Sequence, residues 1–167
     1  MNSTARVVVI GGGVVGCSVL YHLAREGWTD VMLLERDELT SGSTWHAAGG
    51  CHTINGDPNV AKLQKYTIDL YKEIEELSGQ STGLHMTGGF YLASNKTWWD
   101  YLKRERSKAR YMGLHQEWID LKELADRHPL IDTSQYYAAL WDDQDGDLAP
   151  SGATYAFAKA ARVHGAQ

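Results

Sequence analysis

The chain has 167 residues, of which 43% are hydrophobic and 22% charged, and its formal net charge is −5. This length suffices for one modest domain with its own core, and the composition is that of an ordinary folded protein. The acidic balance argues against a nucleic-acid-binding protein, which usually carries a basic face. Cys17 and Cys51 are the only cysteines, too few for a disulfide framework, so a reducing compartment is expected.

The N-terminal apolar segment does not predict secretion. Arg6 is the one cation before it, and the glycines at 11–13 break the apolar run, which makes a poor signal peptide. No stretch approaches the roughly 20 apolar residues that span a bilayer. With no targeting segment recognised, we expect a cytoplasmic protein without a membrane span.

The first part of the chain predicts a strand, a helix and a second strand. Residues 7–10 are a short β-branched run typical of a buried parallel strand, and residues 31–34 are a second one. Between them a helix is expected over residues 14–26, with Gly27 as its C-cap. Its expected buried face consists of Val15, Val19, Leu20 and Leu23. Three such elements within about 30 residues form a βαβ unit.

The rest of the chain predicts mixed helices and strands after a polar loop rich in Ser, Thr and Gly at residues 40–56. The expected helices cover residues 60–77, 97–112, 121–127 and 151–164, and the expected strands cover residues 86–94 and 118–121. The expected helix at residues 97–112 carries a basic run that should form a solvated face, at Arg104, Arg106, Lys108 and Arg110.

Gly11, Gly13 and Gly16 form a G-x-G-x-x-G motif that follows the first strand and opens the helix. Glu35 lies 19 positions after Gly16, at the end of the second strand. In this context the motif predicts a dinucleotide site, with the pyrophosphate at the helix N-terminus beside Val14 and Val15. The Glu35 carboxylate is expected to accept hydrogen bonds from the ribose hydroxyls and to repel a 2′-phosphate, which disfavours NADP. These residues do not distinguish FAD from NAD.

The segment that follows is more specific. Residues 35–50, ERDELTSGSTWHAAGG, resemble the flavin loop of the dimethylglycine and sarcosine dehydrogenase family, within the glycine oxidase and D-amino-acid oxidase group. Residues 86–92 and 146–152 resemble later segments of the same family more loosely. The resemblance implies FAD, bonded covalently through His46 to the flavin 8α-methyl group. The implied cofactor-binding residues of this loop are Arg36, Ser43, Thr44, Trp45, His46, Ala47 and Gly49.

The resemblance also implies a fold and a domain organisation. The fold class is α/β, a Rossmann-type FAD-binding domain with the beginning of an inserted α+β substrate domain. Residues 1–85 would form the FAD-binding unit, residues 86–145 the start of the substrate domain, and residues 146–167 the helix that returns to the FAD domain. Relatives are much longer, so the chain is expected to be truncated, and the catalytic base and substrate clamp are expected beyond Gln167.

The activity implied by the resemblance is the FAD-dependent oxidative N-demethylation of an N-methylated amino acid such as dimethylglycine or sarcosine. A hydride would pass to flavin N5, and the iminium product would hydrolyse to formaldehyde or pass its one-carbon unit to tetrahydrofolate in a C-terminal domain. An electron-transfer flavoprotein or oxygen would be the acceptor. The exact methylamine, the acceptor and the oligomeric state stay open.

Three alternatives remain. One is a non-catalytic regulatory relative of the same fold; such relatives tend to lose the flavin-linking histidine, and His46 argues against it. The second is another FAD-dependent amino-acid oxidase. The third is an NAD-dependent dehydrogenase, against which the Ser-Thr-Trp-His loop argues.

No metal site is expected. Asp142, Asp143, Asp145 and Asp147 suggest a calcium loop, but Leu148 stands where the loop needs its glycine. A solvated acidic turn is the preferred interpretation. His52 follows His46 closely, and an ordinary loop role is expected for it. Cys17 is expected to pack as a small hydrophobic side chain.

Overall fold

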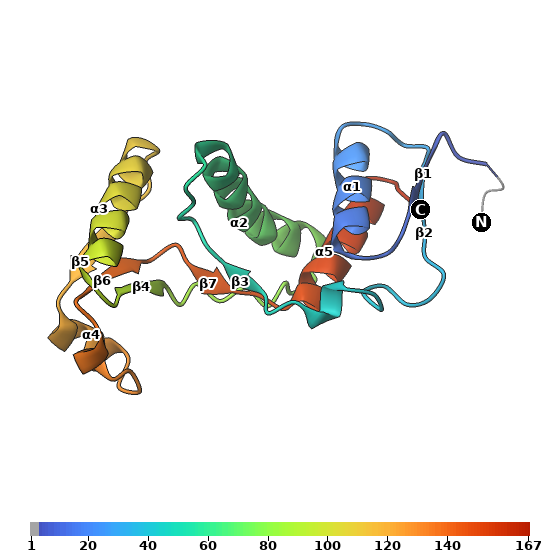
Figure 1. Ribbon diagram of the computed structural model, residues 1–167. Helices are drawn as coiled ribbons and strands as arrows, with labels where there is room; N and C mark the ends of the chain where they lie inside the picture. The colour runs from blue at the N-terminus through green and yellow to red at the C-terminus, as the bar shows by residue number, and fades with distance from the viewer. Residues whose placement is uncertain (1–3) are drawn as a thin grey trace. The chain divides into compact units, whose positions relative to one another are not determined.

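A computed structural model describes residues 4–167, and the chain divides into two compact units (Figure 1). The first unit comprises Met1–Gly49, Ile68–His85 and Asp147–Gln167. The second unit comprises Gly50–Thr67 and Met86–Gly146. Across the described residues, no helix is both long enough and apolar enough to cross a membrane.

The first unit contains the predicted βαβ element. Strands β1 (Val7–Ile10) and β2 (Val31–Leu34) pair in parallel, with Val7 opposite Val31 and Ile10 opposite Leu34. Helix α1 (Val14–Arg25) connects them, and Gly27 ends the connection with φ +89°. The prediction of a Rossmann-type α/β unit is confirmed.

Helix α5 (Pro150–Val163) packs against α1 in the core of the first unit. Pro150 occupies its first turn, where a missing N–H removes no helical bond. Small side chains let the two helices approach closely: Ala153, Ala156, Ala160 and Ala161 of α5 are all buried. After α5 the chain returns to β2, where Gln167 N–H donates to Val31 O at 3.1 Å and Gln167 O accepts from Leu33 N–H at 2.8 Å.

The buried face of α1 matches the predicted one only in part: Leu20 is buried and Leu23 packs against the core. Val15 and Val19 were also expected inside but are 74% and 45% exposed. Contact with α5 and α2 instead buries a stripe shifted around the helix, with Cys17, Tyr21 and Ala24 beside Leu20. Both stripes are apolar, so helical periodicity alone does not decide between them. Cys17 is fully buried, as expected, and desolvation raises its pKa to about 11.

The second unit is built on a three-stranded antiparallel sheet in the order β4–β6–β5. Its strands are β4 (Gly89–Ala93), β5 (Gln116–Ile119) and β6 (Ala138–Asp142). The central strand β6 was not predicted, although it pairs with both others. Its neighbouring residues point to opposite faces: Leu140 packs with Leu102, and Ala139 packs with Leu124.

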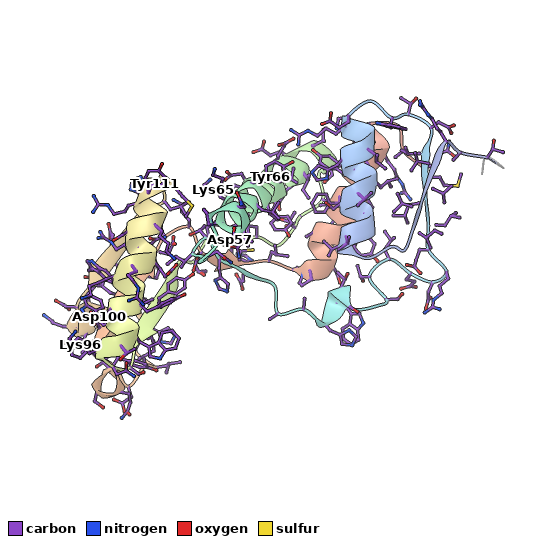
Figure 2. All side chains as sticks on the ribbon, turned by 45° about the horizontal axis from the view of Figure 1, so that its top comes forward. Asp57, Lys65, Tyr66, Lys96, Asp100 and Tyr111 are labelled. Carbon is purple, nitrogen blue, oxygen red and sulfur yellow. The ribbon has the colours of Figure 1, made fainter. Side chains whose placement is uncertain are left out.

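The two helices of this unit follow their predicted ranges. Helix α3 (Lys96–Tyr111) begins at Asn95, whose side chain accepts from Trp98 N–H at 3.0 Å, and α4 (Leu121–Arg127) begins at Asp120, which caps Glu123 N–H at 2.7 Å. These caps satisfy N–H groups that a helix start leaves unpaired. Figure 2 shows Lys96 and Asp100 near one end of α3 and Tyr111 at the other.

The remaining elements are one long helix and several short segments. Helix α2 (Pro58–Ser78) matches the predicted helix and continues from the second unit into the first. The short segments are η1 (Thr44–His46), β3 (Gly50–Cys51), η2 (Thr133–Gln135) and β7 (Gly146–Asp147).

Candidate functional site: a dinucleotide cradle and its loop

The glycine turn after β1 has the backbone geometry that the motif predicts. Gly11 has φ +109°, a conformation that residues with a side chain rarely adopt. At Gly16 an added Cβ would overlap the carbonyl oxygen of Gly11, so only glycine lets the first turn of α1 pack against the turn. Gly13 is the N-cap of α1. The turn therefore delivers the positive end of the helix close to the carboxyl end of β1.

Glu35 ends β2 and ties it to the glycine turn. Its Oε2 accepts from Gly12 N–H at 2.6 Å, and its Oε1 accepts from Arg36 N–H at 2.7 Å and from Asp37 N–H at 3.1 Å. These N–H groups hold the pKa of Glu35 below its ordinary value, and the N–H of Gly12 has the largest effect. The side chain is therefore an ionised acceptor near neutral pH. An ionised carboxylate has roughly four acceptor positions, so about one remains for a ligand hydroxyl.

The loop after β2 folds back over the glycine turn. Thr40 N–H donates to Gly12 O at 3.0 Å, and the Thr44 hydroxyl oxygen accepts from Val14 N–H at 3.0 Å. The second bond uses one of the N–H groups that the start of α1 leaves unpaired. The hydroxyl of Thr44 still carries a proton that it can donate outward. The segment that resembles a flavin loop is thus bonded to the helix start that would hold a pyrophosphate.

His46 lies at the end of η1, on the exposed part of the same loop. Its Nδ1 is 3.2 Å from the carbonyl oxygen of Gly42. Since a carbonyl oxygen only accepts, Nδ1 carries the proton in this bond and the lone pair of a neutral ring is on Nε2. The ring lies against that of Trp45, with centroids 3.8 Å apart. His46 is therefore oriented by two neighbours, with Nε2 as its nucleophilic atom.

Gly49 closes the loop against the start of α5. Its φ is +78°, and a Cβ on it would overlap the carbonyl oxygen of Leu148. Its own carbonyl oxygen accepts from Leu148 N–H at 3.0 Å. The small residue that the loop motif requires at this position is explained by this close approach.

A hollow of about 350 Å³ opens beside the glycine turn. It lies at the carboxyl ends of β1 and β2, the edge at which α/β sheets bind nucleotides. Ile10 beside it is 85% exposed. Its lining combines apolar side chains, glycine backbone and the Glu35 carboxylate, and consists of Ile10, Gly11, Leu34, Glu35, Arg36, Ser41 and Gly42. An apolar wall with one ribose-binding acceptor suits the adenosine end of a dinucleotide.

The structure also shows three residues of the cradle that were not predicted from the sequence. Gly12 is buried, and a Cβ on it would lie 2.5 Å from Leu39 Cδ2 and 3.0 Å from Glu35 Cβ. Ser41 and Gly42 line the hollow, and Gly42 also holds His46. The third consecutive glycine of the turn was a usable signal for Gly12. Nothing in the local pattern indicated Ser41 or Gly42 beyond their place in the loop.

The predicted site residues all belong to the first unit. Thr44 and Glu35 are bonded directly to the glycine turn and the start of α1. Ser43, Trp45, His46 and Ala47 are exposed. Val15 is exposed on α1, and the Arg36 side chain is exposed at the rim of the hollow.

The prediction of a solvated acidic turn holds for Asp143 and Asp147, which are exposed, and is wrong for the other two carboxylates. Asp142 is fully buried and Asp145 is 2% exposed. Asp142 Oδ2 accepts from Thr53 Oγ1 at 2.6 Å and from Gln116 Nε2 at 2.8 Å. Asp145 accepts from Thr53 N–H at 3.0 Å and from the Tyr91 hydroxyl at 2.7 Å. The partners come from distant parts of the chain, which is why the local sequence suggested a solvated turn.

Burial raises the pKa of Asp145 and of Tyr91 above their ordinary values. The ring Nδ1 of His52 lies 3.3 Å from Asp145 Oδ2, so His52 has a carboxylate partner beyond an ordinary loop role. Among the residues that the structure describes, no group of three or more His, Cys, Asp or Glu side chains could hold a metal ion. The buried carboxylates of Asp142 and Asp145, with their hydrogen-bond donors, form a brace within the second unit.

Comparison with known proteins identifies the family. The family model described as "DAO: FAD dependent oxidoreductase" matches residues 6–167. The chain belongs to the FAD-dependent oxidoreductase family. The residues present fit the cofactor that defines this family, since the hollow, the glycine turn and the ionised Glu35 form a dinucleotide cradle.

Curated relatives align with this chain over all or nearly all of its length. Mitochondrial dimethylglycine dehydrogenase of Homo sapiens is 38% identical over 162 residues, 97% of this chain and 19% of the relative. Mitochondrial sarcosine dehydrogenase of Homo sapiens is 39% identical over 168 residues, covering all of this chain and 18% of the relative. The mitochondrial pyruvate dehydrogenase phosphatase regulatory subunit of Mus musculus is 35% identical over 167 residues, covering all of this chain and 19% of the relative.

A solved structure has the same fold over the whole of this chain. The crystal structure of L-proline dehydrogenase from P. horikoshii is 30% identical, with a TM-score of 0.90, over all of this chain and 44% of the solved one. The two human dehydrogenases and the family match confirm the resemblance to the dimethylglycine and sarcosine dehydrogenases. The chain spans about a fifth of the length of the curated relatives that it matches.

Proposed function

We propose that this chain is the FAD-binding part of an amine oxidoreductase that removes an N-methyl group from an amino acid such as dimethylglycine or sarcosine. The observation that carries the proposal is the bond between Thr44 and Val14, which joins the loop around His46 to the helix start of the dinucleotide cradle. A Rossmann turn alone suits many cofactors. A turn bonded to this particular loop, in a chain of this family, suits FAD.

Each part of the cradle has a separate task in binding FAD. The backbone N–H groups of Gly13, Val15 and Gly16 at the start of α1 would stabilise the pyrophosphate charge, while the N–H of Val14 holds the loop through Thr44. Gly11 lets the chain turn beneath it. Glu35 accepts from a ribose hydroxyl, and its ionised state disfavours a phosphorylated ribose. Arg36 lies beside Glu35 at the rim of the hollow and adds a compensating positive charge.

The loop residues would hold the flavin end. Ser43, Ala47 and Gly49 are small and let the backbone approach a flat ring, while Trp45 orients the imidazole of His46. We propose that His46 Nε2 would bond to the 8α carbon in place of one of its hydrogens, which would leave as a proton, while the electron pair of the broken C–H bond would stay on the flavin until its electron acceptor removes it. Gly42 supports this step because its carbonyl holds the proton on Nδ1, which leaves the Nε2 lone pair ready to bond.

FAD supplies a hydride acceptor at its N5 atom, and the protein's contribution is to bind it, orient it and exclude water. Oxidation of an N-methyl group gives an iminium that water converts to formaldehyde and the demethylated amine. Delivery of the one-carbon unit to tetrahydrofolate, and of electrons to an electron-transfer flavoprotein or to oxygen, would require parts of the protein outside this chain. We further propose that residues 86–145 begin the substrate domain.

A second candidate is a regulatory role without catalysis. The regulatory subunit of Mus musculus, 35% identical over the whole chain, supports this alternative. His46 weighs against it, because a covalent flavin link serves redox chemistry.

One experiment on the full-length protein separates the candidates. The purified protein should show flavin absorbance at about 450 nm. Anaerobic addition of dimethylglycine or sarcosine should bleach it, whereas glycine, which lacks the methyl group, should not. A yellow protein that dithionite bleaches but no N-methylated amino acid does would contradict the proposed substrate class. A protein that is still colourless after purification in buffer containing FAD would favour the regulatory alternative.

A further inference from the structure

Thr40 has a backbone conformation that threonine rarely adopts. Its φ is +74°, and within residues 4–167, the part that the structure describes, it is the one residue with positive φ that is not a glycine. In this left-handed region the Cβ atom lies too close to the backbone, and a side chain that branches at Cβ makes the conformation more costly still. The chain therefore has a threonine where a glycine would be less strained, which indicates a role for the threonine side chain.

Two hydrogen bonds hold Thr40 in this conformation. Its N–H donates to Gly12 O at 3.0 Å, and its Oγ1 accepts from the hydroxyl of Ser151 at 3.3 Å. Ser151 lies in the first turn of α5, 111 residues later in the chain, and all three residues belong to the first unit. A glycine at position 40 would keep the first bond but lose the second. The Thr40 hydroxyl thus joins the loop to the start of α5.

The residues that follow Thr40 reach both the hollow of the cradle and His46. Ser41 and Gly42 line the hollow, and the carbonyl oxygen of Gly42 accepts from His46 Nδ1. Thr40 is the point at which the chain, having passed Glu35, turns back over the glycine turn. The direction of the backbone at Thr40 therefore determines where the loop residues lie relative to Glu35.

We propose that Thr40 is a positioning residue for FAD, in which backbone strain and the bond to Ser151 oppose each other. The strain favours an open loop, and the bond favours the closed loop that the structure shows. Their balance sets the fraction of the protein that is ready to bind, and the apparent Kd rises as this fraction falls. The inference rests on the FAD site proposed above, but on neither the covalent link nor the methylamine substrate.

The test measures the Kd of FAD for the deflavinated full-length protein, in the His46→Ala background so that no covalent link forms. Thr40→Val keeps the branched shape but removes the hydroxyl, and Ser151→Ala removes the donor. Each should weaken FAD binding about fivefold, the value of roughly one hydrogen bond between neutral groups. The double variant should be about as weak as either single one, because both lose the same bond. Thr40→Ser keeps the hydroxyl without the branch and should restore tight binding.

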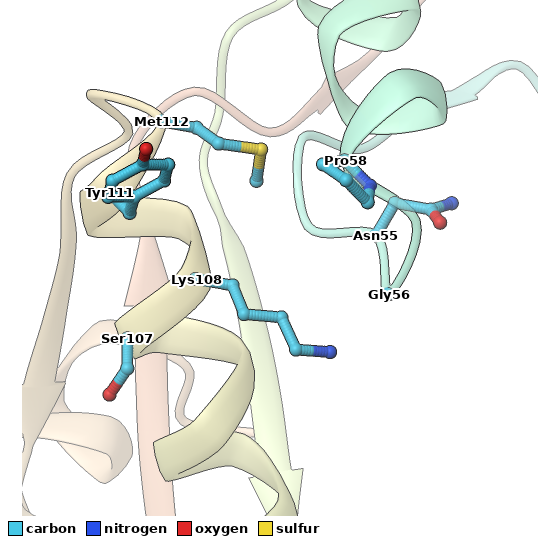
Figure 3. A pocket seen from close by; sticks show the side chains of 7 residues that line it. All are labelled: Asn55, Gly56, Pro58, Ser107, Lys108, Tyr111 and Met112. Atoms are coloured by element: carbon cyan, nitrogen blue, oxygen red, sulfur yellow. The ribbon is translucent and has the colours of Figure 1, made fainter.

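A glycine variant and a matched control separate strain from the general effect of removing a hydroxyl. Thr40→Gly adopts a positive φ without strain, so it should lose less affinity than Thr40→Val. Ser107→Ala is the control for Ser151→Ala, because it removes a helical hydroxyl that donates to Lys103 O at 2.8 Å. Figure 3 shows Ser107 on α3, in the lining of a hollow of about 420 Å³ that belongs to the second unit. This control should leave the Kd of FAD unchanged.

Three results would overturn the proposal. If Thr40→Val and Ser151→Ala lower the Tm of the FAD-free protein but leave the Kd unchanged, the bond only stabilises the fold. If the effects of the two variants multiply in the double variant, the two side chains act separately. If Thr40→Gly loses as much affinity as Thr40→Val, strain does not oppose closure of the loop. A failure to oxidise sarcosine would contradict the proposed function alone, because the Kd comparisons use only FAD binding.

Discussion

The hydroxyl oxygen of Thr44 accepts a hydrogen bond from the backbone N–H of Val14, 30 residues earlier in the chain, at 3.0 Å. This bond fixes the distance between the loop that carries His46 and the first turn of α1. It also replaces one of the water molecules that would otherwise solvate the helix start. The bond therefore holds together the two halves of the proposed FAD site.

Thr44→Val should weaken FAD binding, because valine keeps the shape of threonine but leaves Val14 N–H without its acceptor. The loss should be about 1–2 kcal/mol, or roughly five- to thirtyfold in Kd, the usual effect of one such hydrogen bond near a charged ligand. It is measured by titrating FAD into the deflavinated full-length protein, in the His46→Ala background so that no covalent link forms. Thr44→Ser keeps the hydroxyl and is the matched control. Equal affinities for all three proteins would show that this bond does not support the site.

His46→Ala should release the covalent link while the protein still binds FAD. In the unchanged protein, acid denaturation should leave the yellow colour with the precipitated polypeptide, because of the covalent link proposed between His46 Nε2 and the flavin. In the variant the colour should move to the supernatant. His115→Ala, at an exposed histidine of the second unit, is the control and should keep its colour in the precipitate. Colour in the supernatant of the unchanged protein would disprove the covalent link without disproving FAD binding.

Glu35 should make the stability of the fold depend on pH. Backbone N–H groups, first that of Gly12, lower its pKa in the folded state below the ordinary value of 4.5. The ionised carboxylate therefore stabilises the fold fully above pH 4.5, and this contribution is lost as the pH falls through the lowered folded pKa. Thermal unfolding of the full-length protein between about pH 3 and pH 7 should show a smaller loss of Tm in Glu35→Gln than in the unchanged protein. Exposed Glu117→Gln is the control, and identical pH profiles for Glu35→Gln and the unchanged protein would contradict the prediction.

Thr53→Val should destabilise the second unit. Thr53 is fully buried, and its hydroxyl donates to Asp142 Oδ2 at 2.6 Å. Valine has the same shape but leaves a buried carboxylate oxygen with one donor fewer, which should reduce the free energy of unfolding by about 1–3 kcal/mol. Urea denaturation of the full-length protein measures the loss. Thr97→Val, at an exposed position of α3, tests whether threonine replacement alone has an effect. A change no larger than that of Thr97→Val would mean that the brace around Asp142 contributes little.

The helices and most strands could be predicted because their signals are local. The β-branched run before Gly11, the cap at Asp120 and the proline at the start of α5 each act within a few residues, so the chain segment specifies its own conformation. The glycine motif is also a local signal, since a positive φ at Gly11 is a property of one residue. Strand β6 was missed because Ala138–Asp142 has no clear alternation and depends on partners on both sides.

By itself, the sequence determined the Rossmann turn, the acidic end of β2 and the loop with His46, because these depend on short-range geometry and on an uninterrupted motif. Only the tertiary structure decided which side of α1 is buried, since Val15 and Cys17 are both apolar and the choice is made by where α5 packs. It also decided that Asp142 and Asp145 are buried. Their charges are tolerated inside because donors from distant segments surround them, and no local pattern records such an arrangement.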